Sequence, residues 1–244
     1  MLTPLRRLFS ASRSPRQFIP SVVPGARHVS SWAAGAGQPF HHGAMSTNRY
    51  QIRLAGRADI PAILDLIGST AKWLQACKDT DQWARPWPDK ERRDTRVEQG
   101  ILDGLTWIVE DSHGMLAGTV TCREHGNEIL WTDQEMAEEA AYVSRLIVSR
   151  DLAGDGIGAA LIDWAGLHGA REWGAKSIRV DVWTTNLALH DYYRERGFEH
   201  VRTLDFEDYW EYPSAALFQK PMAAVDQDAA ARFEPAEEAS LAAR

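Results

Sequence analysis

The chain has 244 residues, of which 44% are hydrophobic and 25% are charged, a composition typical of a folded globular protein. No apolar run approaches the roughly 20 residues that a membrane-spanning helix needs, so we expect no membrane partner. The two cysteines, Cys77 and Cys122, belong to no metal-binding spacing and the histidines are scattered, so no metal site is expected.

Charge is distributed unevenly along the chain. The formal net charge is −7, but residues 1–44 carry five arginines and no acidic residue, which leaves 22 basic and 34 acidic residues, a net charge of −12, in the rest. Phosphate contacts need clustered Lys and Arg, so nucleic acid is not expected as a partner. An acidic surface favours a cationic acceptor such as an amine, although it can also serve solubility alone.

Residues 1–48 are expected to form a disordered leader. This segment is rich in Arg, Ser, Ala, Pro and Gly, which is also the composition of a mitochondrial transit peptide. Because the domain pattern begins within a few residues of Met45, we favour translation from Met45 and a cytoplasmic protein over mitochondrial targeting.

The first part of residues 49–222 predicts alternating helices and strands of one α/β domain. The expected elements are a strand at 50–54, a helix beginning near Asp59, a polar helix at 89–103, and a β-hairpin of 105–110 and 115–121.

The segment 142–174 predicts a strand, a glycine-rich turn and a helix. Its strand is the apolar run ending at Val148, and Gly154, Gly156 and Gly158 follow. Glycine permits backbone conformations that point successive N–H groups at one spot, and a helix begins there. A helix N-terminus of this kind suits phosphate or pyrophosphate, so we expect a phosphorylated cofactor.

The turn has three alternative interpretations. The glycines can serve a tight turn alone. A P-loop needs Lys followed by Ser or Thr, but Ala159 and Ala160 stand there. The dinucleotide fingerprint is formally met by Gly154, Gly156 and Ala159, with Asp181 where a ribose-binding acid can lie. About a hundred residues of mixed sequence precede Gly154, however, which is unlike a Rossmann unit.

The later elements carry a second motif. A strand from 178 to 183, a helix around His190, and strands near 201–206 and 215–219 are expected. In the run NLALHDYYRERGFE, Asn186 is followed by Tyr193 seven residues later and then by Gly197 and Phe198. Together with the valine and glycines upstream, this spacing resembles the second half of the core of GNAT-type N-acetyltransferases.

The resemblance covers residues 50–222 in order of elements, and its specific part is 143–198. It implies a single GNAT-type α/β domain with a mixed, mostly antiparallel sheet, flanking helices and splayed central strands. The sequence departs from the family pattern at Ala153, where an Arg or Gln is usual, which puts a side-chain contribution to cofactor affinity in doubt.

The resemblance further implies acetyl transfer from acetyl-CoA, as cosubstrate, to a primary amine of a small molecule. Tyr193 is then the general acid that protonates the departing thiolate, or an aromatic residue that fills the groove between helix and sheet. Asn186 hydrogen-bonds the pantetheine arm, caps a helix, or does both. The remaining cofactor-binding residues are expected to be Leu146, Ile147, Val148, Ala153, Gly154, Asp155, Gly156, Ile157 and Gly158.

Several points stay open at this stage. No residue is singled out as general base among Glu110, Glu124, Asp133 and Asp181. Aromatic residues for an acceptor wall are Trp73, Trp83, Trp87, Trp131, Tyr209 and Trp210, and small amines, antibiotics, amino acids and protein N-termini are all acceptors to consider. A homodimer is compatible with the sequence.

The alternative functions are a non-catalytic acyl-CoA sensor and an NAD-dependent oxidoreductase. Residues 223–244 are expected to form a flexible C-terminal tail.

Overall fold

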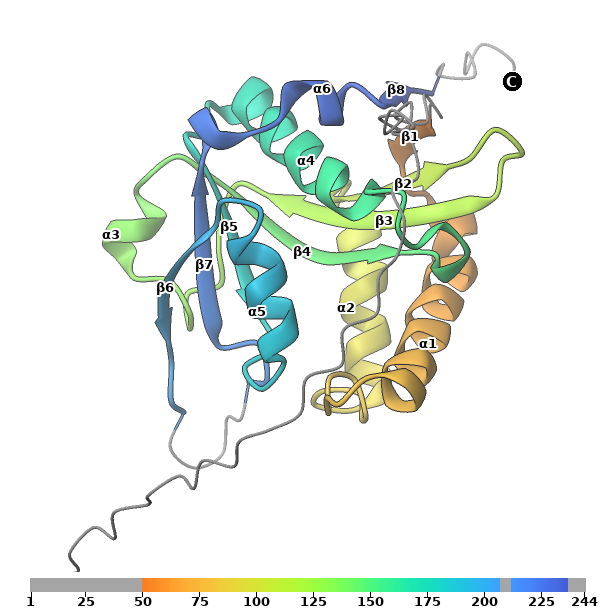
Figure 1. The fold of residues 1–244 in the computed structure, drawn as a ribbon, viewed down its shortest axis with the longest axis horizontal. Coiled ribbons are helices and arrows are strands. Elements are labelled where there is room, and N and C mark those ends of the chain that lie inside the picture. The colour runs from red at the N-terminus through yellow and green to blue at the C-terminus, as the bar shows by residue number, and fades with distance from the viewer. Residues whose placement is uncertain (1–49, 207–211, 237–244) are drawn as a thin grey trace, which may run out of the picture. The chain divides into compact units, whose positions relative to one another are not determined.

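The computed structural model describes residues 50–206 and 212–236, and the predicted leader, residues 1–48, lies outside them. Within these ranges the strands form one sheet in the order β6-β7-β5-β4-β3-β2-β1-β8 (Figure 1). The strands are β1 (Tyr50–Leu54), β2 (Thr106–Glu110), β3 (Leu116–Arg123), β4 (Ala140–Val148), β5 (Ser177–Val182), β6 (Glu199–Thr203), β7 (Ala216–Pro221) and β8 (Phe233–Pro235). The helices are α1 (Ile60–Cys77), α2 (Lys90–Leu102), α3 (Asp133–Met136), α4 (Ile157–Trp173), α5 (Leu187–Arg194) and α6 (Gln227–Ala230), with the 3-10 turns η1 (Arg57–Asp59), η2 (Arg150–Leu152) and η3 (Met222–Ala224).

The predicted fold class is confirmed, because a single mixed sheet is flanked by helices. The helix expected at 89–103 is α2, and the expected hairpin is formed by β2 and β3. The strand that precedes the glycine turn is longer than predicted. It begins at Ala140, where small buried residues without a strong strand propensity join the parallel partner β5.

Helix α4 covers one face of the sheet. Ile157, Leu161 and Ala165 recur at helical spacing and are fully buried in the largest apolar cluster. Gly169 lets the helix approach β4 closely, because a Cβ there would lie 2.7 Å from the Cβ of Ala141. The position of α4 therefore depends on a small residue in its interior despite the cost to helix propensity.

Helices α1 and α2 pack on the opposite face. Ile63 and Ile67 of α1 and Val97 and Ile101 of α2 are buried in one cluster with Ile108 of β2. The exposed side of α2 is charged and that of α1 is mostly small or polar, which is the amphipathic pattern of a surface helix.

The parallel strands β4 and β5 separate towards their C-terminal ends. Their register runs from Ala140 opposite Ser177 to Val143 opposite Val180, and no pairing follows although β4 continues to Val148. The edge of β4 that faces β5 is therefore free over its last five residues. The predicted splay of the central strands is thus present in the structure.

The prediction of a flexible tail over residues 223–244 is wrong for residues 227–235. They form α6 and then β8, which pairs in parallel with β1. The physical reason is Phe233, whose buried ring lies 6.1 Å from that of Tyr50 and adds to the sheet's apolar core. Residues 237–244 lie outside the described ranges.

Candidate active site

A cleft of about 970 Å³ opens where β4 and β5 separate. The last residues of β4, the start of α4, and residues of α5 line it, and the connection between α1 and α2 closes it from another side. Four of the tryptophans predicted for the acceptor wall, Trp73, Trp83, Trp87 and Trp131, line this cleft, whereas Tyr209 and Trp210 lie outside the described residues.

The glycine turn lies at the mouth of the cleft, at the N-terminus of α4. Gly154 and Gly156 have φ angles of +100° and +72°, a region that side chains disfavour. Gly156 is the N-cap and forms no side-chain cap, so the first N–H groups of the helix keep their hydrogen-bonding capacity. The predicted residues Ala153, Gly154, Gly156, Ile157 and Gly158 all line the cleft.

Asp155 stands apart from the other residues of the turn, since it does not line the cleft. Its backbone carbonyl accepts a hydrogen bond of 2.7 Å from Arg232, which comes from the C-terminal segment between α6 and β8. The Arg232 guanidinium also lies 3.6 Å from where a Cβ of Gly156 would be. A cation therefore lies next to the turn although Ala153 offers none.

Asn186 caps helix α5, as one of the two predicted roles requires. Its side-chain oxygen accepts a hydrogen bond of 3.0 Å from the backbone N–H of Leu189. Its amide nitrogen donates to the side chain of Gln82, 2.6 Å away, in the connection between α1 and α2. Asn186 lines the cleft, and the pantetheine role stays a prediction.

Two adjacent tyrosines of α5 line the cleft, Tyr192 and Tyr193. Tyr193 is 8% exposed and its ring packs against Phe198 and Phe218 at 5.2 and 6.1 Å. Burial raises the pKa of the Tyr193 phenol, so its proton stays in place at neutral pH. The Tyr192 hydroxyl lies instead over the start of α4, 3.1 Å from where a Cβ of Gly158 would be.

Of the four candidate general bases, only Asp181 of β5 lines the cleft. Burial raises the pKa of Asp181 to about 6, and the Tyr212 hydroxyl donates a hydrogen bond of 3.0 Å to its carboxylate. Glu110 is paired with Arg53, and Glu124 and Asp133 are exposed to solvent. The sequence could not rank these acids, because burial against β4 and the Tyr212 segment is a property of the fold.

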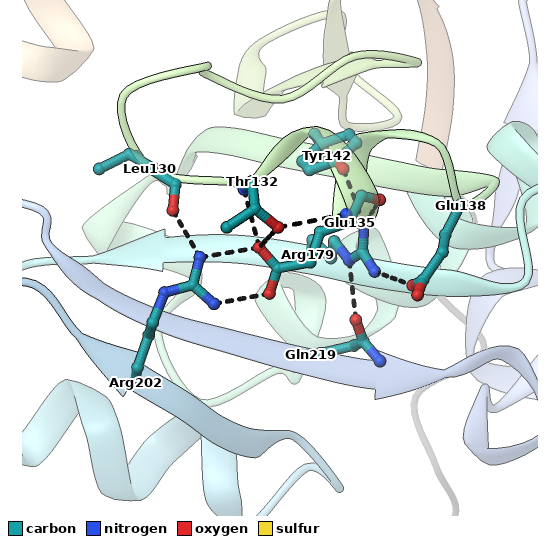
Figure 2. Close-up of polar contacts among 8 residues, drawn as sticks. All are labelled: Leu130, Thr132, Glu135, Glu138, Tyr142, Arg179, Arg202 and Gln219. Carbon is teal, nitrogen blue, oxygen red and sulfur yellow. Dashed lines mark hydrogen bonds and ion pairs between the residues drawn. The ribbon is translucent and has the colours of Figure 1, made fainter.

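A network of polar contacts supports one wall of the cleft (Figure 2). Arg179 of β5 is almost fully buried, donates to the Tyr142 hydroxyl at 2.8 Å and to Gln219 at 2.7 Å, and pairs with Glu138. Arg202 of β6 forms two hydrogen bonds with the Glu135 carboxylate, at 2.6 and 2.8 Å. These contacts hold α3 and the Tyr142 ring in position.

Two further arginines, which the sequence did not single out, reach into the cleft. Arg123 ends β3 and Arg145 lies in β4, and both line the cleft. A Cβ on Gly100 of α2 would lie 3.4 Å from a terminal nitrogen of Arg145 and 3.9 Å from one of Arg123. Gly100 therefore faces both guanidinium groups at the distance of van der Waals contact.

Within residues 50–206 and 212–236, no group of three or more His, Cys, Asp or Glu side chains is arranged to hold a metal ion. None of the helices in this part of the chain is long and apolar enough to cross a membrane.

Comparison with known proteins places this geometry in a family. Residues 70–198 match the model of the acetyltransferase (GNAT) family. The chain is 30% identical over 147 residues to an uncharacterised N-acetyltransferase of Bacillus subtilis (strain 168), YesJ, with 59% of this chain and 78% of that protein covered.

Solved structures agree with this match. A GNAT-family acetyltransferase from Listeria monocytogenes is 26% identical, with a TM-score of 0.54 and coverage of 70% of this chain and 94% of that one. The fold is also similar to that of spermidine N-acetyltransferase from Vibrio cholerae in complex with CoA and spermine, at 18% identity, a TM-score of 0.50 and coverage of 72% and 98%. The chain therefore belongs to the acetyltransferase (GNAT) family and is an N-acetyltransferase.

Proposed function

We propose that this protein transfers an acetyl group from acetyl-CoA to the primary amine of a small molecule. The observation that carries the proposal is the start of α4, uncapped by a side chain, at the cleft between the separated ends of β4 and β5. The complex of the Vibrio relative with CoA and spermine supports both the cosubstrate and the amine class.

The cofactor would lie along the free edge of β4. Leu146, Ile147 and Val148 offer unpaired backbone groups on the side facing β5, to which a pantetheine arm can hydrogen-bond as an added strand does. The diphosphate then lies over residues 153–158, where the helix dipole and the N–H groups favour negative charge. Arg232 adds a positive charge beside the turn, which compensates for Ala153.

With the thioester held there, the neutral amine attacks its carbonyl carbon and negative charge develops on the carbonyl oxygen. A backbone N–H near Val148 stabilises that charge. The carbon–sulfur bond then breaks, and the leaving thiolate takes the phenolic proton of Tyr193. The proton lost by the amine passes to Asp181, whose raised pKa of about 6 suits a base at neutral pH.

The direct test is release of free CoA thiol from acetyl-CoA in the presence of a panel of amines, amino acids and peptides. We expect saturable thiol release with one class of amine. Calorimetry with acetyl-CoA and with NAD separates the alternatives. Binding of acetyl-CoA without turnover on any amine would favour an acyl-CoA sensor, and binding of NAD alone would favour an oxidoreductase.

The role of Tyr193 is tested by comparing Tyr193→Phe with Tyr192→Phe, since both tyrosines line the cleft. Loss of the proton donor is expected to lower kcat by about 10²–10⁴-fold in Tyr193→Phe, with acetyl-CoA affinity little changed. A larger fall of kcat in Tyr192→Phe would transfer the acid role to Tyr192.

A further inference from the structure

The cleft is strongly basic although the chain as a whole is acidic. Among the described residues that line it, two are aspartates, Asp79 and Asp181, and one is a lysine, Lys78. Seven are arginines: Arg85, Arg93, Arg96, Arg123, Arg145, Arg150 and Arg196. A cleft lined in this way concentrates anions, so the net charge of the chain does not predict the charge of its ligand.

Most of the cationic groups already have partners. Arg93 pairs with Asp94, Arg150 lies 3.6 Å from the centre of the Trp73 ring, and Arg196 donates to the Tyr192 carbonyl at 2.9 Å. Arg96 donates to the Trp87 carbonyl and stacks on that ring. These contacts account for their place in the wall without any ligand.

Arg196 also has a buried Nε without a partner, but its guanidinium still donates to the Tyr192 carbonyl. Arg123 and Arg145 differ from the other arginines, because no hydrogen bond or ion pair within the described ranges engages either side chain. Within residues 50–206 and 212–236, a terminal nitrogen of Arg145 and the Nε of Arg123 are buried without a hydrogen-bond partner. No carboxylate in those ranges forms an ion pair with either. A buried guanidinium nitrogen left unpaired costs about 1–3 kcal/mol or more, because it has lost its water.

The backbone also carries strain at this place. The register between β3 and β4 shifts between Thr119, opposite Ile147, and Thr121, opposite Ser144, so β4 has a bulge there. Arg145 is the bulged residue and has a φ of +49°, which costs an L-residue about 1–2 kcal/mol. The bulge turns the Arg145 side chain towards Gly100 of α2 and the cleft.

We propose that Arg123 and Arg145 form the anion-binding part of the acceptor site and that the acceptor is an amine that also carries a carboxylate, such as an amino acid. This inference rests on the proposed acetyl transfer. The two guanidinium groups match a planar oxyanion through several hydrogen bonds. Asp181, held by Tyr212 in the same cleft, receives the amine end of the molecule.

The unpaired buried nitrogens and the strained backbone at Arg145 both serve the binding of a carboxylate. Burial and the nearby charges of Arg123 and Arg96 lower the pKa of Arg145 to about 10, which leaves it cationic at neutral pH. A carboxylate bound between the guanidinium groups would remove both their mutual repulsion and their unmet hydrogen bonds. A polyamine, which is cationic throughout, would have to overcome that repulsion.

The test measures kcat/KM for α-amino acids and for their carboxamides, which keep the amine but lack the negative charge. The wild type is expected to favour the acid by at least about 30-fold, and the preference is expected to fall to about threefold or less in Arg145→Met and in Arg123→Met. Arg92→Met removes one positive charge from the exposed side of α2 and should keep the wild-type preference. Circular dichroism verifies that each variant is folded.

A second readout does not need turnover. Calorimetry in the presence of CoA compares N-acetyl amino acids with their carboxamides, and tight binding of the acid alone that is lost in Arg145→Met is the expected result. Equal binding of acid and amide by the wild type, or an acid preference that persists in both arginine variants, would overturn the proposal. Absence of thiol release with every amine, while the acid is still bound selectively, would reject acetyl transfer but not the anion site.

Discussion

Two pairs of arginines lie on the same face of the sheet, on either side of Tyr142, and their surroundings are opposite. Arg179 and Arg202 are fully engaged by carboxylates, carbonyls and side-chain oxygens (Figure 2). Arg123 and Arg145 have buried nitrogens with no partner among the described residues. The first pair completes the fold, whereas the second is complete only with a ligand.

The acids of the two regions differ in the same way. Hydrogen bonds from Arg202 lower the pKa of Glu135 to about 2, so this carboxylate is held as a permanent anion. Burial raises the pKa of Asp181 to about 6, so this carboxyl group can exchange a proton near neutral pH. Pairing stabilises structure, and incomplete pairing leaves groups available for chemistry.

The largest expected effect is a loss of turnover on substitution of Asp181, the acid near Arg123 and Arg145. Asp181→Asn removes the proton acceptor and should lower kcat by about 10²–10⁴-fold. In the wild type the rate should rise with pH between about 5 and 7, because the base is active when ionised. Tyr212, Tyr193, Arg145 and Arg123 face Asp181 and shape this titration. A pH–rate profile that is flat from 5 to 7, or unaffected turnover in Asp181→Asn, would exclude Asp181 as the base.

Substitution of Arg179, in the fully paired region, is expected to lower the free energy of unfolding. Arg179→Met leaves Gln219 and the Tyr142 hydroxyl without their shared donor, whereas the exposed Glu138 carboxylate can be solvated by water, so the expected loss is about 1–3 kcal/mol of the free energy of unfolding. Denaturant unfolding followed by circular dichroism measures it. A loss below about 1 kcal/mol would mean that the network contributes little to the fold.

Substitution of Glu135 is expected to lower the free energy of unfolding by a smaller amount, which depends on pH. Because its pKa is lower in the folded than in the unfolded chain, its contribution is present above about pH 4.5 and is lost as the pH falls towards 2. Solvent screening limits that contribution to about 1 kcal/mol. Unfolding of Glu135→Gln and wild type should therefore differ at pH 6 and converge near pH 2, and a constant difference would contradict this origin.

The smallest change in stability is expected at Arg145. Arg145→Asn removes an unpaired buried charge and introduces a residue that tolerates a positive φ, so the free energy of unfolding should stay within about 1 kcal/mol of wild type or rise. The same denaturant titration measures it. A loss as large as that of Arg179→Met would show that Arg145 is a structural residue like Arg179.

The glycine turn and the two helix starts of the proposed cofactor site could be predicted from the sequence because their determinants are local. Gly154, Gly156 and the following helix are consecutive, and the spacing from Asn186 to Tyr193 lies within one helix and its cap. Most of the expected cofactor contacts come from backbone groups, and the residue types alone predict where the turn and the helix starts place those groups.

The acceptor half could not be predicted in this way. The bulge at Arg145 exists only through pairing with β3, and the neighbour of its guanidinium, Gly100, comes from the distant helix α2. Asp181 differs from other strand acids only by burial. The strand β8 could not be predicted for a related reason, since this three-residue segment ending at Pro235 is a strand only because it pairs with the edge of β1.

A crystal structure of the protein with CoA and an N-acetyl amino acid would test the account most directly. We predict the CoA diphosphate over residues 153–158 and a carboxylate oxygen within about 3 Å of the buried Arg145 nitrogen, with Arg123 on the same carboxylate. A carboxylate turned away from both arginines, or a diphosphate bound away from the glycine turn, would contradict it.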